Sequence, residues 1–175
     1  MVAGEASGDL LGSRLVEALR RRLPEAVFCG IGGPRMVAAG FDSWFPQEAL
    51  AVRGFVEVLR HLPEVLTVRR ALARRLKAEP PQLFVGIDAP EFNLGLERRL
   101  KRSGVVTVHL VSPQVWAWRP GRVETLRAAA SRVLVLFPFE EAIYRAADVP
   151  VTYLAARLCD VFPDGTSALV TRGSA

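Results

Sequence analysis

Short, nearly continuous apolar runs alternate along this chain with longer segments in which apolar residues recur every three or four positions. The apolar runs predict strands at residues 27–31, 83–87, 105–111, 133–137 and 151–154. The periodic segments predict amphipathic helices: one through Leu11, Leu15, Leu19 and Leu23, one from Val65 to Leu76, and one after Asp88. Such strands, separated by such helices, predict an α/β fold with a doubly wound, mostly parallel sheet and right-handed crossovers.

The two ends of the chain depart from this pattern. Three residues precede the first glycine turn at Gly4, fewer than the about five of a usual strand. A first strand normally lies at the centre of such a sheet, so we expect it to have lost its beginning. Residues 164–175 have little apolar content and no clear period, which predicts a frayed or truncated end. We expect one domain over residues 1–154, followed by an atypical tail at residues 155–175.

Composition is that of a globular, cytoplasmic domain. The 175 residues are 50% hydrophobic and 23% charged. No run approaches the roughly 18 uncharged apolar residues of a membrane span, and the N-terminus has no signal-peptide pattern. Cys29 and Cys159 are too few and too far apart for a disulfide framework or a metal site. These features favour a reducing compartment.

The chain is basic, with a formal charge of +5 and a pI near 10.0. Its basic residues cluster at residues 20–22, 69–70, 74–77, 98–99 and 101–102. Two interpretations stay open: solvated helix faces, or attraction to an anionic surface. Motifs of RNA-recognition domains, zinc fingers and basic zippers are missing from the sequence, so a membrane ranks above nucleic acid as the partner.

The strand predicted at residues 83–87 ends in a carboxylate, Asp88. Ligands bind outside the carboxyl ends of strands in open α/β sheets, so Asp88 is placed to act as a general base toward a substrate hydroxyl. The alternative is structural: Asp88 caps the next helix, with Pro90 in its first turn and Glu91 completing a capping box. The pattern does not separate these two roles.

A glycine-rich turn from Gly4 to Asp9 opens the first predicted helix. Backbone N–H groups at a helix N-terminus favour anions, but Glu5 and Asp9 would repel a phosphate. The spacing matches neither the dinucleotide nor the Walker motif, which argues against a nicotinamide-dependent oxidoreductase. Two alternatives remain open: a hydroxyl-rich ligand, or a structural turn in which Ser7 caps the helix and Asp9 complements its dipole.

Three further features have alternative interpretations. Residues 51–59 carry more apolar side chains than one helix face buries, which indicates core packing or an acyl-chain and membrane contact. Trp116 and Trp118 cannot share one helix face, so at least one stacks on a ligand, meets a membrane, or anchors its loop. His109 lies within a predicted strand and is interpreted as a satisfied core histidine.

Five blocks of sequence, in order and with matching spacing, resemble the lipid-A-disaccharide synthase family. They are AGEASGD (residues 3–9), GIGGPRM (30–36), GIDAPEFN (86–93), HLVSPQVWAWR (109–119) and FPFE (137–140). Each block alone is weak, but the set of five is specific. The resemblance extends from residue 2 to about residue 154.

This resemblance implies an inverting glycosyltransferase of the GT-B architecture, with residues 1–154 as its Rossmann-like, acceptor-side N-terminal half. Such an enzyme transfers 2,3-diacylglucosamine from UDP to 2,3-diacylglucosamine 1-phosphate, giving lipid A disaccharide 1-phosphate. The family implies a peripheral location on the cytoplasmic side of the inner membrane, with no cofactor, no metal and no nucleic acid.

The resemblance also implies residue roles. The aspartate of the Gly-Ile-Asp block, here Asp88, is the general base for the acceptor 6-hydroxyl. The implied substrate-binding residues are Gly4, Glu5, Ser7, Gly8, Asp9, Asn93, Ser112 and Trp116. The chain departs from the family pattern at Glu91 (commonly Asp), Leu110 (Tyr) and Gln114 (Ser).

After Leu154 the family continues Gly-His-Pro-Leu into a second domain that supplies most UDP contacts in GT-B enzymes. This chain instead reads Ala155-Ala156-Arg157-Leu158 and ends soon afterwards. We therefore expect the second, nucleotide-sugar domain to be absent and this chain alone to have little transferase activity. The alternative function is a non-catalytic lipid- or membrane-binding module derived from the enzyme.

Overall fold

The computed structural model describes residues 1–50, 55–111 and 121–154; within residues 55–61 it describes the backbone alone. The described strands form a single parallel sheet in the order β3-β2-β1-β4-β5-β6-β7. Their bounds are Val2–Ala3 (β1), Cys29–Ile31 (β2), Asp42–Phe45 (β3), Leu83–Ile87 (β4), Val106–Leu110 (β5), Arg132–Val135 (β6) and Val151–Tyr153 (β7). The predicted doubly wound α/β fold is confirmed.

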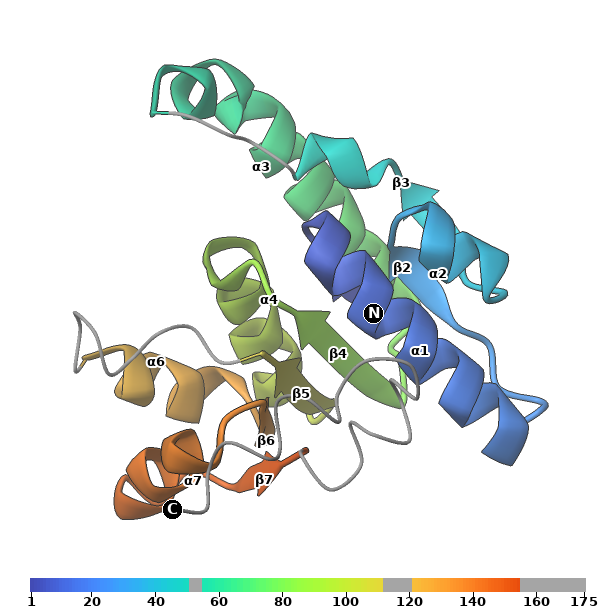
Figure 1. The fold of residues 1–175 in the computed structure, drawn as a ribbon. Coiled ribbons are helices and arrows are strands. Elements are labelled where there is room, and N and C mark those ends of the chain that lie inside the picture. Colours follow the sequence, from blue (N-terminus) through green and yellow to red (C-terminus); the bar gives the residue numbers. More distant parts are fainter. Residues whose placement is uncertain (51–54, 112–120, 155–175) are drawn as a thin grey trace.

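Helices follow most of the strands and cover both faces of the sheet (Figure 1). They are Ala6–Arg22 (α1), Pro34–Ala38 (α2), Phe55–Ala78 (α3), Pro90–Arg102 (α4), Gly121–Ala129 (α6) and Pro138–Ala146 (α7), with a 3₁₀ turn η1 at Gln47–Ala49. None of the helices in the described residues has the length and hydropathy of a membrane span.

Strand β4 divides the core because successive strand residues point to opposite faces. Phe84 packs with Leu72 of α3 and Leu96 of α4, whereas Ile87 packs on the other face with Val16 of α1. A third apolar cluster joins α4, α6, α7 and strand β6. The sheet is therefore buried on both faces, as the nearly continuous apolar runs predict.

Several predicted bounds are corrected. Strand β3 has no predicted counterpart, and β2 begins at Cys29 rather than at residue 27. Strand β6 ends at Val135, because Pro138 starts α7 and Phe137 becomes its N-cap. Helix α1 ends at Arg22, so the last leucine of the predicted helix lies outside it. The first strand lies inside the sheet, between β2 and the central strand β4.

Candidate active site

Two strand-to-helix turns meet at the middle of the sheet. Strands β1 and β4 are neighbours, while their helices α1 and α4 pack on opposite faces. This reversal is the topological switch point at which open α/β sheets bind ligands. The two turns touch: a Cβ atom added to Gly4 would lie 2.5 Å from the Cβ of Ala89. The carboxyl ends of β1 and β4 thus form one continuous rim.

Asp88 lies on this rim in a strained conformation. Its backbone N–H donates to the carbonyl of Leu110 at 2.9 Å, which continues the β4–β5 ladder by one residue. Asp88 and Ala89 then both adopt left-handed conformations, with φ of 57° and 44°, and Val111 at the end of β5 has a φ of 70°. Each such residue costs on the order of 1–3 kcal/mol, and this kind of strain clusters at functional sites.

The Asp88 carboxylate is not used to cap α4. The N-cap of that helix is Ala89, which makes no side-chain cap hydrogen bond, and Glu91 instead pairs with Arg122 at 2.8 Å. The capping-box alternative is therefore wrong. Among the described residues, the recorded side-chain contact of Asp88 is with Ser7, whose Oγ donates to Oδ2 over a long 3.5 Å. The half-exposed carboxylate is left available to a ligand.

Glu5 and Ser7 are exposed at the start of α1, on the same rim as Asp88. The N-cap of α1 is Glu5, and it makes no side-chain cap hydrogen bond. The prediction that Ser7 caps this helix is therefore wrong. Gly8 is buried, and a Cβ atom there would lie 3.4 Å from the Cβ of Ala3, so the helix begins close against β1.

Asp9 points away from the rim and holds another helix. Its side chain is 3% exposed, and its oxygens accept hydrogen bonds from the backbone N–H groups of Arg35 at 3.0 Å and Met36 at 2.9 Å. These are first-turn donors of α2, which have no partner within their own helix. A carboxylate at a helix N-terminus is also favoured by the helix dipole. Asp9 thus fixes α2 against α1.

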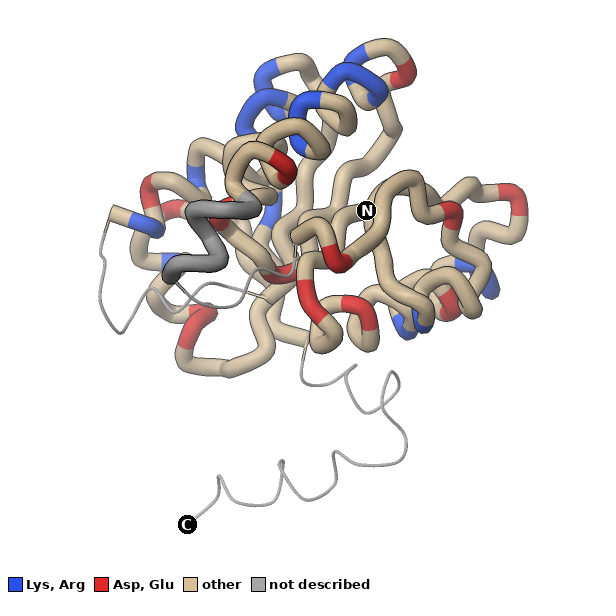
Figure 2. The backbone as a smooth tube through the Cα atoms, turned by 90° about the horizontal axis from the view of Figure 1, so that it is seen from above, with Lys and Arg blue, Asp and Glu red and all other residues tan. Residues whose placement is uncertain are grey.

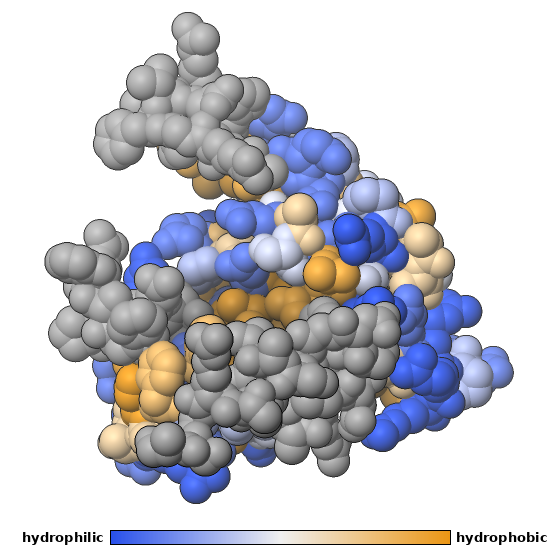
Figure 3. Space-filling model, viewed as in Figure 1, coloured by the Kyte–Doolittle hydropathy of each residue, from blue (hydrophilic) through white to orange (hydrophobic). Residues whose placement is uncertain are grey.

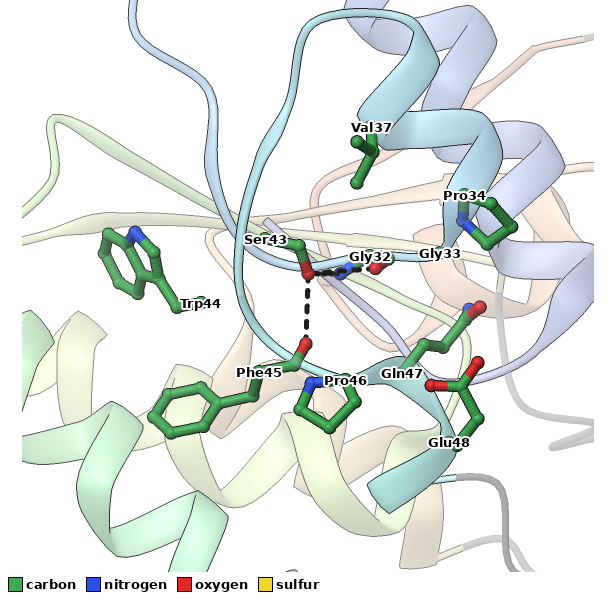
Figure 4. A pocket seen from close by; sticks show the side chains of 10 residues that line it. All are labelled: Gly32, Gly33, Pro34, Val37, Ser43, Trp44, Phe45, Pro46, Gln47 and Glu48. Atoms are coloured by element: carbon green, nitrogen blue, oxygen red, sulfur yellow. Dashed lines mark hydrogen bonds between the residues drawn. The ribbon is translucent and has the colours of Figure 1, made fainter.

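Gln47, which the sequence patterns do not single out, supports the same turn. Its Nε2 donates to the carbonyl of Glu5 at 2.7 Å and to that of Ala3 at 3.3 Å. It also borders a pocket of about 350 Å³ between the β2–α2 turn and η1. Figure 4 shows that Gln47 and Glu48 lie on one side of this pocket and Ser43 and Trp44 on the other. The pocket adjoins the rim at the carboxyl ends of β2 and β3.

Asn93 connects Asp88 to β1 from below. It is fully buried, and its Nδ2 donates to the carbonyl of Asp88 at 2.8 Å and to that of Val2 at 3.3 Å. One turn further along α4, the Oε1 of Glu97 lies 2.8 Å from the Nδ1 of His109 on β5. Asn93 therefore holds the strained turn by its backbone rather than by the carboxylate.

Glu97 and His109 form a fully buried pair beneath the site. A Cβ atom at Gly86 would overlap the Glu97 carboxylate, so β4 has room for this side chain because it carries glycine there. Within the described part of the chain, three buried side-chain atoms have no hydrogen-bond partner: Asn93 Oδ1, Glu97 Oε2 and His109 Nε2. The predicted core position of His109 is confirmed, although its Nε2 has no hydrogen-bond partner among the residues that the structure describes.

The structure brings together Gly4, Glu5, Ser7, Gly8 and Asp88 at one rim, and it places Asp9 and Asn93 behind that rim. Ser112 and Trp116 lie outside the described residues, as do residues 51–54 and the tail at 155–175. The roles predicted for Ser112 and Trp116 therefore stay predictions.

The strand order and the rim define a Rossmann-like α/β domain with a carboxylate at its switch point. The family model described as lipid-A-disaccharide synthetase matches residues 1–170, and the chain belongs to this family. It is 55% identical over 172 residues to lipid-A-disaccharide synthase of Dechloromonas aromatica, covering 98% of this chain and 45% of that protein.

Other relatives agree. The chain is 57% identical to the synthase of Thiobacillus denitrificans and 52% identical to that of Bordetella pertussis, each over 163 residues. These matches cover 93% of this chain and 44% and 42% of the two relatives. The chain thus spans less than half the length of the curated relatives that it matches.

Proposed function

We propose that this chain forms the acceptor side of a glycosyltransferase of lipid A biosynthesis. The reaction transfers 2,3-diacylglucosamine from UDP to 2,3-diacylglucosamine 1-phosphate. The observation that carries this proposal is the placement of Asp88: it stands at the switch point, in a strained turn, with a carboxylate that no described helix terminus uses. The name shared by the curated relatives, lipid-A-disaccharide synthase, supports this assignment.

In this mechanism Asp88 accepts the proton of the acceptor 6-hydroxyl. The freed oxygen lone pair forms the new bond to the donor anomeric carbon, while the bond from that carbon to UDP breaks and its electron pair leaves with UDP. A positioned general base typically contributes about 10²–10⁴-fold to the rate. Ser7, with its Oγ 3.5 Å from Oδ2, is placed to steady the carboxylate.

The neighbouring residues take two kinds of role in this proposal. Glu5 and Ser7 line the opening and contact sugar hydroxyls. Gly4 and Gly8 act by letting this turn pack closely, because Ala89 and Ala3 take the space that their missing side chains leave. Asp9 and Asn93 act through the turns that they hold. Ser112 and Trp116 complete the acceptor side.

We assign the UDP contacts to the part of the relatives that extends beyond their match with this chain, because the match covers 45% or less of their length. Activity is therefore to be tested in an enzyme of the relatives' full length that carries this domain. The alternative function is a non-catalytic module that binds lipid or membrane. Vesicle binding without UDP release would favour this alternative over the glycosyltransferase.

The proposed location is the cytoplasmic face of the inner membrane, with the protein bound peripherally. The positive charge of +5 supports attraction to anionic lipid. Figure 3 shows hydrophobic surface in a hollow beneath α3, bordered by hydrophilic residues, which suits a substrate that carries acyl chains.

Replacement Asp88→Asn in the full-length enzyme tests the proposal. Asparagine tolerates the left-handed conformation, so the fold should be retained while the base is lost. We expect kcat for UDP release to fall by about 10²–10⁴-fold with an unchanged Tm. The matched control is Asp148→Asn, which changes another left-handed aspartate, at φ 53°, far along the chain. Retained turnover in the folded Asp88 variant would remove this residue from its proposed role.

A further inference from the structure

A second concave site lies between α3 and α4. It is at the opposite end of the strands from Asp88. This groove has a volume of about 590 Å³ and is lined by the second half of α3 and the second half of α4. Val105, which also lines it, directly precedes β5, and Pro80 lies between α3 and β4. The groove is therefore at the amino ends of the strands and is separate from the rim described above.

The floor of the groove is apolar. It is formed by Leu76 of α3, Leu96 and Leu100 of α4, and Val105, all of which belong to one hydrophobic cluster. Its volume falls within the about 300–1,000 Å³ typical of small-molecule sites. An apolar chain laid on this floor would extend the existing core and lose contact with water.

The rim of the groove is cationic: it carries Arg70, Arg74, Lys77 and Arg99. All four side chains belong to exposed residues, and none has a recorded hydrogen bond or ion pair among the residues that the structure describes. Figure 2 shows the basic residues gathered on the second half of α3.

Neighbouring cations on the same two helices are already engaged. Arg75 stacks on the ring of Trp44 at 3.8 Å, and Lys101 donates to the carbonyls of Arg127 and Ala130. The four rim cations line the groove and are thus placed to meet a ligand there.

The described residues that line the groove include no carboxylate that would balance its positive charge. Burial lowers the pKa of Arg69, and the adjacent Arg99 guanidinium lowers it further. The two acidic residues of α4 are committed elsewhere, since Glu97 pairs with His109 and Glu91 pairs with Arg122. An anion bound beside Arg99 would relieve this repulsion between like charges.

We propose that the groove binds a membrane phospholipid with an acidic headgroup, its phosphate on the cationic rim and one acyl chain on the apolar floor. The apolar floor favours this ligand over nucleic acid, which would need exposed aromatic or polar groups to contact its bases. Arginine suits the phosphate because its planar fork donates two parallel hydrogen bonds. The site is independent of the transferase mechanism.

Isothermal titration calorimetry of the 175-residue chain with lysophosphatidylglycerol, below its critical micelle concentration, tests the proposal. We expect saturable binding at one site. Glycerol 3-phosphate lacks the chain, and lysophosphatidylcholine offsets the anionic charge. Each should bind about tenfold more weakly or worse, since each removes one of the two contact types.

Variants locate the site. Arg70→Gln/Arg74→Gln should weaken lysophosphatidylglycerol binding by about tenfold, whereas the matched control Arg21→Gln/Arg22→Gln, at the exposed end of α1, should change it by less than about twofold. Ala73→Trp fills the groove without changing charge and should also weaken binding. If the Ala73 variant does not fold by circular dichroism, the charge variants decide alone.

Three outcomes would overturn the proposal. They are equal loss of binding in the α1 control, equal affinity for lysophosphatidylcholine, and tighter, Arg70- and Arg74-dependent binding of single-stranded RNA. Asp88→Asn should leave the affinity for lysophosphatidylglycerol unchanged; a loss in this variant would place the lipid at the transferase site instead.

Discussion

At Asp88 an uncommon backbone conformation coincides with a carboxylate that does not cap the helix that follows it. Two successive non-glycine residues in the left-handed region, Asp88 and Ala89, are held in place by the Asn93 side chain and by pairing to Leu110. The surrounding structure therefore supports the strain through the backbone. The carboxylate itself contributes one long contact to Ser7 among the described residues, and so it is available for chemistry.

Gly4 is required by close packing of the two turns. A methyl group at this position would lie 2.5 Å from the Cβ of Ala89. We expect Gly4→Ala to lower the free energy of unfolding by about 1–3 kcal/mol, measured by urea denaturation, because two backbone turns would have to separate. The control Gly121→Ala adds a methyl group to open space at the start of α6 and should not destabilise the chain. Equal stability of both variants would contradict this packing.

At the scale of single residues, part of the candidate site could be predicted from the sequence. The position of Asp88 follows from an apolar run that ends in a carboxylate. The sequence does not predict that the Asp88 carboxylate leaves α4 uncapped, because an alanine gives no signal of the left-handed conformation that Ala89 adopts. Gln47 was not predicted because its partners, the carbonyls of Ala3 and Glu5, lie more than 40 residues away in the chain.

At the scale of elements, Asp9 ties α2 to α1. Asp9→Ala would leave the N–H groups of Arg35 and Met36 without their acceptor. We expect a loss of about 1–3 kcal/mol in the free energy of unfolding by urea denaturation. Asp9→Asn keeps one acceptor oxygen and should lose less, and Glu25→Ala, on an exposed loop, serves as the control. No difference between the Asp9 and Glu25 alanine variants would contradict the assigned cap.

The Glu97–His109 pair joins α4 to β5 inside the core. Removing one partner, as in Glu97→Met, leaves a buried polar group unpaired and should cost about 1–3 kcal/mol. Removing both, with Glu97→Met/His109→Leu, should recover much of that loss because no orphaned partner remains. A double-mutant cycle in urea measures this coupling. Strictly additive single and double variants would show that the two side chains do not interact.

The elements themselves were predicted unevenly. The strand at residues 83–87 has the predicted bounds, and the strand predicted at 105–111 is observed as Val106–Leu110. Strand β3 was missed because Asp42–Phe45 has two apolar residues, too few for a run, and pairs with β2 alone. Helix α3 continues through Pro63, a residue that normally indicates a helix end. At β3, pairing with β2 overrides the local pattern.

At the scale of the whole molecule, the strand order places β4 in the middle of the sheet and β3 and β7 at its edges. Amides of β4 are in the core of the sheet, whereas each edge strand pairs on one side. Hydrogen exchange followed by mass spectrometry should therefore show peptides over residues 83–87 exchanging more slowly than those over 42–45 and 151–153. Equal protection of centre and edge would contradict this topology.

The same order brings the β1 and β4 turns together and separates the candidate active site from the α3–α4 groove by the length of the strands. That topology could be predicted as a class, because alternating strands and helices imply a doubly wound sheet. The register that pairs Val2 with Gly86 and Ile31 could not be predicted, because it depends on packing between segments that are distant in sequence. The groove depends on how α3 and α4 pack against each other, which no local pattern encodes.

The most direct test of the central claim is the single-turnover rate of UDP release by the full-length enzyme, with both sugar substrates saturating, for wild type and Asp88→Asn. This measurement separates chemistry from binding. If Asp88 takes the hydroxyl proton, the rate constant falls by about 10²–10⁴-fold while acceptor affinity is retained. An unchanged single-turnover rate, or a loss confined to acceptor affinity, would contradict the account.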